Sequence, residues 1–197
     1  MITAVLRDLD GVVRHFDPDG SSGIEARHGL GNDLLNEVAF AQPLLTEVAT
    51  GQMTRREWIE SIGERVGSTA AAEEWALQRP VVDEEVLRLA DKLRAQCIAV
   101  AVLTNDTDTT SEEVTTPGIH GRVEAVFNSA EIGACKPDPR SFQHAPDVLC
   151  RPAEAVFFVA DNPENVSGAT ALGLPAHVFV GALELETELR SRGLLQG

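Results

Sequence analysis

Two aspartates, Asp8 and Asp10, follow a short apolar run near the start of the chain and precede Gly11. Residues two apart lie on the same side of a strand, so both carboxylates would project from one strand end. Two close carboxylates repel each other unless a cation or a proton lies between them. The pair is therefore suited to metal binding, acid–base work or nucleophilic attack, although Asp-Gly is also a common hairpin turn.

Polar groups also accompany three later segments of the chain. They are Thr104 and Asn105 after the apolar residues 98–103, Lys136 before Pro137-Asp138-Pro139, and Asp161 after the apolar residues 156–160. In an open α/β sheet, ligands bind outside the carboxyl ends of the strands, so these groups can converge at one edge. Carboxylates are the oxygen ligands that Mg²⁺ prefers. A hydroxyl, a backbone N–H at a strand-to-helix turn and a lysine would supply the contacts that phosphoryl transfer requires.

The elements that would position these groups alternate between apolar runs and amphipathic segments from residue 83 onward. Continuous apolar runs are typical of strands covered on both faces, so the pattern predicts a parallel sheet flanked by helices, an α/β fold. Besides the runs already named, we expect strands at residues 2–6, 125–127 and 177–180, and helices at residues 83–93, 109–115, 165–172 and 183–195.

Prolines mark two further helix boundaries. Pro117-Gly118 is expected to end the helix at residues 109–115. Another helix is expected to begin at Pro137-Asp138-Pro139, with Asp138 as its cap and Pro139 at the first helical position. Pro146 falls inside that helix and is expected to bend or shorten it, because proline has no N–H to donate.

Residues 23–79 have helical spacing and contain no convincing strand. Residues 17–23 predict a loop before them, and Thr54 with Glu57 forms a capping-box pattern at the start of one helix. The block therefore predicts a small helical bundle inserted between two strands of the sheet. The expected organisation is a core of residues 1–13 and 83–197 and a helical insertion of residues 14–82.

The composition excludes several classes of partner. The chain has 197 residues and a formal net charge of −15, which argues against binding to nucleic acid or to an anionic membrane surface. No apolar run reaches membrane length, and no basic leader precedes the first strand. Three scattered cysteines suit reduced thiols in the cytoplasm better than a disulfide framework. We expect a cytoplasmic monomer or homodimer acting on a small molecule.

Taken together and in order, four segments resemble the motifs of the haloacid dehalogenase-like (HAD) hydrolase superfamily. They are Asp8-Leu9-Asp10-Gly11-Val12-Val13, Thr104-Asn105, the lysine segment Gly133-Ala134-Cys135-Lys136-Pro137-Asp138-Pro139, and Asp161-Asn162-Pro163-Glu164-Asn165. The resemblance covers the whole chain. It implies a Rossmann-like, three-layer core with a small helical cap inserted after the first motif. It also implies a Mg²⁺-dependent phosphohydrolase of a small phosphomonoester, such as a sugar phosphate or another metabolite phosphate.

The resemblance assigns the chemistry to the aspartates. Asp8 would attack phosphorus and form an aspartyl-phosphate intermediate. Asp10 would protonate the leaving oxygen and later activate water, and its backbone carbonyl would touch the metal. Asp8 and Asp161 would be the metal carboxylates.

The resemblance also assigns the groups around the phosphate. Thr104 and Asn105 would hold the phosphoryl oxygens, and Lys136 would stabilise the negative charge around Asp8. Asn165 would lie near the metal shell or near Lys136. Arg14 and His15 follow the first motif and begin the loop into the insertion, so they are the residues best placed there to contact substrate.

Several nearby residues have simpler interpretations. Arg7 is expected to point away from Asp8 and to pair with an acidic neighbour under the sheet. Asp106 is interpreted as part of a solvated turn and Asp108 as a helix cap. Ala160 stands where many relatives have an acidic residue, which would weaken the outer shell of the metal.

Three alternatives remain open. A phosphomutase has the same motifs. A 2-haloacid dehalogenase attacks carbon without a metal and lacks an acid at the position of Asp10, so the presence of Asp10 favours a phosphatase. A non-catalytic member that binds a phosphorylated ligand is favoured only by Ala160.

Overall fold

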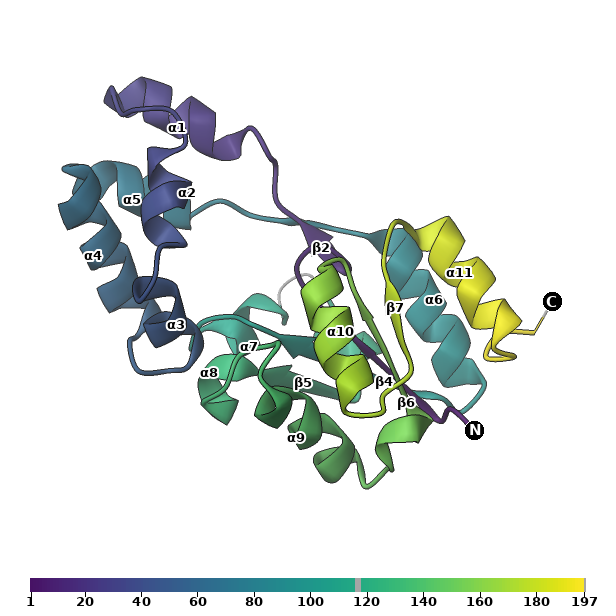
Figure 1. Cartoon of the computed structure of the whole chain (residues 1–197). Coiled ribbons are helices and arrows are strands. Elements are labelled where there is room, and N and C mark those ends of the chain that lie inside the picture. The colour runs from purple at the N-terminus through teal and green to yellow at the C-terminus, as the bar shows by residue number, and fades with distance from the viewer. Residues whose placement is uncertain (116–117, 197) are drawn as a thin grey trace.

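The computed structural model describes residues 1–115 and 118–196, and its central element is a five-stranded parallel sheet (Figure 1). The strands lie in the order β5-β4-β1-β6-β7, with bounds β1 Ala4–Arg7, β4 Ala99–Thr104, β5 Ala125–Asn128, β6 Val156–Ala160 and β7 Ala176–Val178. Strand β1 lies between β4 and β6, so the residues that follow these three strands meet at one edge. The predicted α/β fold with a Rossmann-like parallel core is confirmed.

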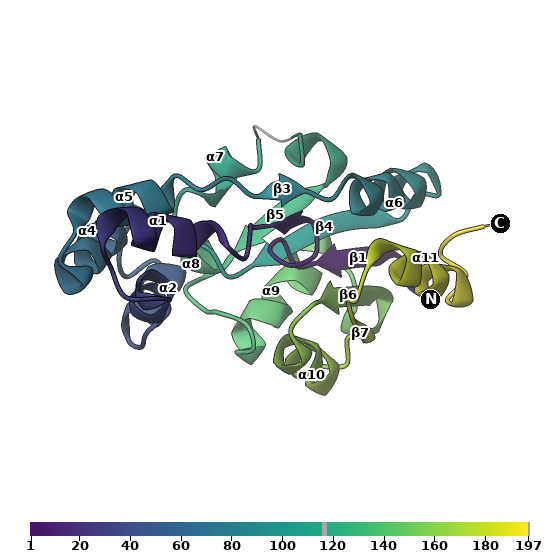
Figure 2. The ribbon, with the colours of Figure 1, turned by 90° about the horizontal axis from the view of Figure 1, so that it is seen from above.

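Helices cover both faces of the sheet. One face packs against α6 (Glu84–Ala95) and α11 (Ala182–Ser191), with Val5, Val100 and Phe157 among the sheet residues in this layer. The other face packs against α9 (Pro139–Leu149) and α10 (Pro163–Ala171). Figure 2 shows α6 and the pair α9 and α10 on opposite sides of the strands. All three layers are thus made of residues from the predicted core.

Five helices form a separate cluster with a hydrophobic centre of its own, which includes Leu35, Trp58 and Ile62. We call residues 14–82 the helical insertion, and its helices are α1 Gly20–His28, α2 Leu34–Ala39, α3 Leu44–Ala49, α4 Arg55–Val66 and α5 Thr69–Ala76. The two chain segments that join it to the sheet pair as short antiparallel strands, β2 (Arg14–His15) and β3 (Val81–Val82). Both strands lie outside residues 23–79, for which no strand was predicted, and they were missed because two-residue strands carry no periodic signal.

Several local predictions can be compared with the structure. Thr54 and Glu57 form the expected capping box on α4, and Asp138 caps α9 with a proline in its first turn. Helix α9 continues through Pro146 to Leu149, and α1 already begins at Gly20, inside the predicted loop.

The segment after β4 is less helical than predicted. Helix α7 covers only Thr110–Glu113, and Pro117, the predicted helix end, lies outside the described residues. Two short 3-10 helices, His120–Arg122 and Ala153–Ala155, precede β5 and β6, and α8 (Ser129–Ile132) follows β5. Among the described residues, no helix combines the length and apolar character needed to span a membrane.

Candidate active site

Asp8 and Lys136 form a buried ion pair at the carboxyl end of β1. Lys136 Nζ lies 2.6 Å from Asp8 Oδ1, and the two side chains are 1% and 10% exposed. The same Nζ donates to the backbone carbonyl of Leu103 at 2.7 Å, and the N–H of Leu9 donates to Asp8 Oδ1 at 2.9 Å. Burial raises the pKa of Asp8, while the charge and hydrogen bond of Lys136 oppose that rise. The pair is an oriented acidic group beside a fixed cation, an arrangement compatible with a carboxylate nucleophile.

The Asn105 side chain makes two hydrogen bonds to the backbone of Lys136 and so fixes the loop that contains this lysine. Its side-chain Nδ2 donates to the Lys136 carbonyl at 2.8 Å, and its Oδ1 accepts from the Lys136 backbone N–H at 2.7 Å. Thr104 is buried in the last position of β4, the neighbour of β1 in the sheet. The structure therefore brings Asn105 into contact with Lys136, and Thr104 directly precedes Asn105 at the end of β4. Contact with phosphoryl oxygens stays a prediction, and for Asn105 it falls to the backbone N–H because the side chain holds Lys136.

Asp161 follows β6 and lies against the loop that carries Asp8 and Asp10. A Cβ built on Gly11 would come within 2.1 Å of Asp161 Oδ2, and Gly11 has a φ of +77°. Only glycine adopts this backbone conformation at low cost, and here it also leaves room for the carboxylate. Asn165, the predicted outer-shell residue, is buried on the helix that follows.

Across the described residues, no cluster of three or more His, Cys, Asp or Glu side chains is placed to hold a metal ion. The expected set is different in kind, since it consists of the Asp8 and Asp161 carboxylates and the backbone carbonyl of Asp10. The close approach of Asp161 to the first loop fits that set. The raised pKa of Asp8 fits it too, because a buried carboxylate gains from a nearby cation.

Arg14 binds Asp10 through two nitrogens. Its Nε lies 2.6 Å from Asp10 Oδ1 and its Nη2 lies 3.2 Å from Oδ2. The same guanidinium contacts Asp106 at 2.9 Å and Glu113 at 3.1 Å. Sequence reasoning placed Arg14 on the substrate, whereas the structure places it on three carboxylates. Its partners Asp106 and Glu113 were missed, because nothing in their spacing from Asp10 marks them.

Asp106 is not part of a solvated turn, so that interpretation was wrong. Its side chain is 12% exposed, and burial raises its pKa to about 6 despite the nearby charge of Arg14. Asp108 does not cap α7; its Oδ1 accepts from the backbone N–H of Arg55, the first residue of α4. Both residues therefore contact the helical insertion, Asp106 through Arg14 and Asp108 through Arg55.

Arg7 differs from expectation, whereas substrate contact by His15 stays a prediction. Arg7 is buried, and its Nη1 donates to the Val86 carbonyl at 3.1 Å, while its Nε and Nη2 have no partner among the described residues. Burial lowers the pKa of Arg7 to about 10, and the charge of Asp91 only partly opposes this. The predicted ion pair under the sheet is therefore absent from the described part of the chain. His15 lies 3.6 Å from Asp83 across the two connecting segments, half exposed.

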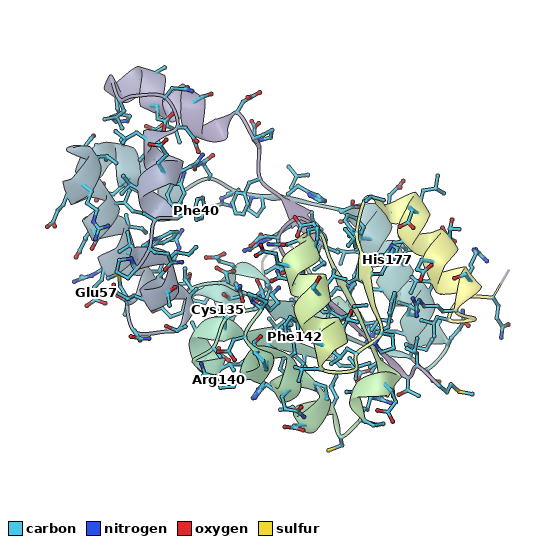
Figure 3. The ribbon with its side chains drawn as sticks, in the orientation of Figure 1. Phe40, Glu57, Cys135, Arg140, Phe142 and His177 are labelled. Carbon is cyan, nitrogen blue, oxygen red and sulfur yellow. The ribbon has the colours of Figure 1, made fainter. Side chains whose placement is uncertain are left out.

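A cleft of about 430 Å³ separates α3 of the helical insertion from the Lys136 loop. Its lining is neutral on the insertion side and includes charged groups on the core side: Gln42, Leu45, Thr46, Ala49, Thr50, Asn105, Ala134, Cys135, Lys136, Pro137, Asp138 and Arg140. Figure 3 shows Cys135 and Arg140 on the core side. Arg140 is occupied by Asp138 at 2.7 Å. This cleft adjoins the Asp8–Lys136 pair through Lys136 itself.

The sequence model of the haloacid dehalogenase-like hydrolases matches residues 2–173 of this chain. The chain belongs to the haloacid dehalogenase-like hydrolase family. As a HAD-like hydrolase it is also similar to phosphatase MT3486 of Mycobacterium tuberculosis, with 29% identity over 201 residues that cover 90% of this chain and 87% of that protein. The predicted family and the prediction of a HAD-like hydrolase are confirmed.

Two solved structures agree with this HAD-like fold. The HAD family enzyme bt-2542 of Bacteroides thetaiotaomicron, crystallised with magnesium and inorganic phosphate, superimposes with a TM-score of 0.77 at 22% identity, covering 90% of this chain and 94% of that one. The L-2-haloacid dehalogenase of Xanthobacter autotrophicus superimposes with a TM-score of 0.68 at 20% identity, covering 97% and 83%. At these identities the likeness concerns the fold alone.

Proposed function

We propose that this HAD-like hydrolase is a Mg²⁺-dependent phosphohydrolase of small phosphomonoesters that acts through an aspartyl-phosphate on Asp8. The observation that carries the proposal is the buried Asp8–Lys136 pair at the end of the central strand. The similarity to a mycobacterial phosphatase supports it, as does the similarity to a structure that holds magnesium and phosphate. The residues 14–82 would act as a cap over this site.

The reaction has two balanced halves. In the first, a carboxylate oxygen of Asp8 bonds to phosphorus, the bond from phosphorus to the ester oxygen breaks, and Asp10 gives that oxygen a proton. In the second, a water oxygen bonds to phosphorus while Asp10 takes a proton from that water, and the bond from phosphorus to the Asp8 oxygen breaks, which regenerates the Asp8 carboxylate and the protonated Asp10 and frees inorganic phosphate. Lys136 stays protonated throughout and offsets the charge around Asp8.

Mg²⁺ would be held by the Asp8 and Asp161 carboxylates and the Asp10 carbonyl. When bound, it supplies positive charge that orients the phosphate and neutralises its oxygens. Thr104 and the Asn105 backbone hold the phosphoryl oxygens, since both lie at the end of the strand next to β1. The absence of an acidic group at Ala160 leaves the outer shell with one carboxylate fewer.

The leaving group of the substrate is placed in the cleft under α3. Its volume of about 430 Å³ lies within the range of small-molecule sites. The side chains that the insertion contributes are uncharged, and Asp138 and Arg140 neutralise each other. This lining suits an uncharged leaving group such as a sugar or another hydroxylated metabolite.

One experiment tests the proposal. Hydrolysis of an aryl phosphate is measured with Mg²⁺, with a chelator, and with the Asp8→Asn variant. We expect turnover with Mg²⁺ that both the chelator and the variant abolish. Turnover that survives in Asp8→Asn would contradict the covalent mechanism. Release of chloride from a 2-haloacid would instead indicate a dehalogenase, isomerisation of a sugar phosphate a mutase, and phosphate-ligand binding without turnover a non-catalytic member.

A further inference from the structure

Arg14 is the centre of a buried network at the junction of the sheet domain and the helical insertion. Its side chain is 3% exposed although it carries a full charge. All three guanidinium nitrogens are engaged: Nε and Nη2 contact Asp10, Nη2 also contacts Asp106, and Nη1 contacts Glu113. Its backbone belongs to β2, and its carbonyl accepts from the N–H of Gly11. Arg14 is therefore fixed both by its backbone and by its side chain.

Asp10 depends on Arg14 for its orientation. The Asp10 side chain is 40% exposed. Within residues 1–115 and 118–196, both of its carboxylate oxygens are hydrogen-bonded by Arg14 and by no other side chain. A planar guanidinium that binds both oxygens of a carboxylate fixes the plane of that group, whereas a lysine acts as a point charge. Without Arg14, the Asp10 carboxylate would be free to rotate.

The helical insertion reaches the same network through Glu113. Glu113 Oε2 binds Arg14, and its Oε1 lies 3.6 Å from Nε of Arg55, the first residue of α4. The backbone N–H of Arg55 is held by Asp108 at 2.8 Å. Arg55 and Glu113 are each about one-third exposed, so this outer ion pair contributes less than the buried contacts of Arg14. Arg55 is thus connected to Asp10 through three successive ion pairs, with Glu113 and Arg14 between them.

We infer that Arg14 is a positioning residue that orients the Asp10 carboxyl group toward the leaving oxygen, to which the protonated form of Asp10 gives its proton, and that Arg55 supports Arg14 through Glu113. The inference rests on the proposed function, in which Asp10 transfers the proton. It assigns Arg14 a role other than substrate contact, since its nitrogens are already occupied. A misaimed proton donor slows the release of a poor leaving group most, because a good one departs without protonation.

The test compares an aryl phosphate, which has a good leaving group, with an alkyl phosphate, which has a poor one. We expect Arg14→Met to lower kcat for the alkyl ester by about 10- to 100-fold more than for the aryl ester, as general acid catalysis contributes about 10²–10⁴-fold. Arg14→Lys keeps the charge but not the planar contact. Its kcat should therefore also fall more for the alkyl ester than for the aryl ester, but by a smaller factor than in Arg14→Met. If Arg14→Met does not fold, the comparison of the two esters with Arg14→Lys still tests the inference.

Three outcomes would overturn the inference. Equal losses on both esters would assign Arg14 a purely structural role, and wild-type behaviour of Arg14→Lys would show that charge alone suffices. Faster alkyl-ester turnover in either variant would mean that Arg14 restrains Asp10. Asp10→Asn tests the proton transfer by Asp10 separately from the orientation of Asp10 by Arg14. Should Asp10→Asn itself show no leaving-group preference, the proposed role of Asp10 fails first.

The contribution of the insertion is tested with neighbouring arginines. Arg55→Met should reproduce the leaving-group preference at about 2- to 5-fold, consistent with a partly exposed pair. Arg56 is the matched control, because it is highly exposed and its one ion pair within the described residues is with Glu60 on its own helix. Arg56→Met should leave both esters unaffected. Equal effects of Arg55→Met and Arg56→Met would show that Arg55 does not support Arg14 through Glu113.

Discussion

The two carboxylates that end the central strand are held by cations in different ways. In the described structure Asp8 has one cation, Lys136, whose Nζ also donates to the Leu103 carbonyl and lies 5.8 Å from the centroid of the Phe158 ring. Asp10 shares its cation, Arg14, with Asp106 and Glu113. The first arrangement balances one buried negative charge, while the second leaves an excess of negative charge around one guanidinium. Two carboxylates that follow the same strand can therefore be prepared for different tasks by the number of acids around the cation that binds each of them.

Removing the cation from the Asp8 side should have the largest effect. Lys136→Met leaves a buried carboxylate without its partner, and we expect kcat to fall by about 10²–10³-fold. Asp8 already has a raised pKa from burial, and loss of Lys136 raises it further. A carboxyl with a higher pKa in the folded state binds more protons there, so the stability of the variant should decrease as pH rises above about 4.

Steady-state kinetics and urea unfolding at acidic and alkaline pH check this prediction. A variant whose kcat stays within about tenfold of wild type would show that Lys136 offsets little charge in the transition state. A pH profile of stability identical to that of the wild type would show that Asp8 does not depend on Lys136.

Removing one of the negative charges around Arg14 should have the next largest effect. It should increase the stability of the protein, whereas loss of Lys136 is harmful. Burial raises the pKa of Asp106 to about 6. The folded protein therefore binds a proton there between about pH 4 and 6 that the unfolded chain has released, and stability falls across this window. Asp106→Asn resembles the protonated form, so it should gain about 2–3 kcal/mol over wild type between pH 4 and pH 8.

Unfolding by urea at a series of pH values measures that gain. Because the effect comes from one titration, the difference between variant and wild type should be small near pH 4 and reach its full size by about pH 7. A difference that is constant with pH would show that Asp106 keeps its ordinary ionisation in the fold.

A substitution at Gly11 tests the proposed Mg²⁺ site beside Asp8, because Gly11 lies against the Asp161 carboxylate. Its Cβ would fall 2.1 Å from the Asp161 carboxylate. Gly11→Ala should raise the Mg²⁺ concentration needed for half-maximal activity by about tenfold, as displaced ligand groups do. The matched control is Gly67→Ala, since Gly67 has a φ of +75° but no atom within 4 Å of the added Cβ.

Both glycine variants should lose about 1–2 kcal/mol of stability from the left-handed backbone. Only Gly11→Ala should change the Mg²⁺ dependence, which a titration of activity with Mg²⁺ measures. A shift of equal size in Gly67→Ala would assign the effect to general destabilisation.

The smallest effect is expected at a third buried cation, Arg7. In the described part of the chain its guanidinium makes one hydrogen bond, to the Val86 carbonyl, and that carbonyl keeps its place in the hydrogen bonding of α6. Replacing a buried charge that lacks an ionic partner with an apolar side chain of similar length removes a desolvation cost. Arg7→Met should therefore change stability by less than about 1 kcal/mol or increase it.

Arg14→Met is the contrast for Arg7→Met, since it leaves three carboxylates without their shared cation and should cost about 3–5 kcal/mol. Denaturant unfolding of the two variants side by side checks the difference. Equal losses would mean that Arg7 has an ionic partner after all.

The order of the strand-end motifs determined much of this protein. Continuous apolar runs of four to six residues indicate strands buried on both faces, and such strands lie parallel between helices. Their polar ends then meet at one edge, which is why Asp8, Lys136, Asn105 and Asp161 were expected together. Caps such as Thr54 and Asp138 were also readable, because capping acts within one helical turn.

Only the tertiary structure decided the partners of Arg14. Its carboxylates come from the end of β1, from the segment after β4 and from α7, and no local pattern relates these positions. The same is true of the Asn105 side chain, which holds a backbone 31 residues away, and of the short pairing between β2 and β3. Local physics fixes periodicity and caps, whereas the choice among several acids for one cation depends on where the packed layers bring them.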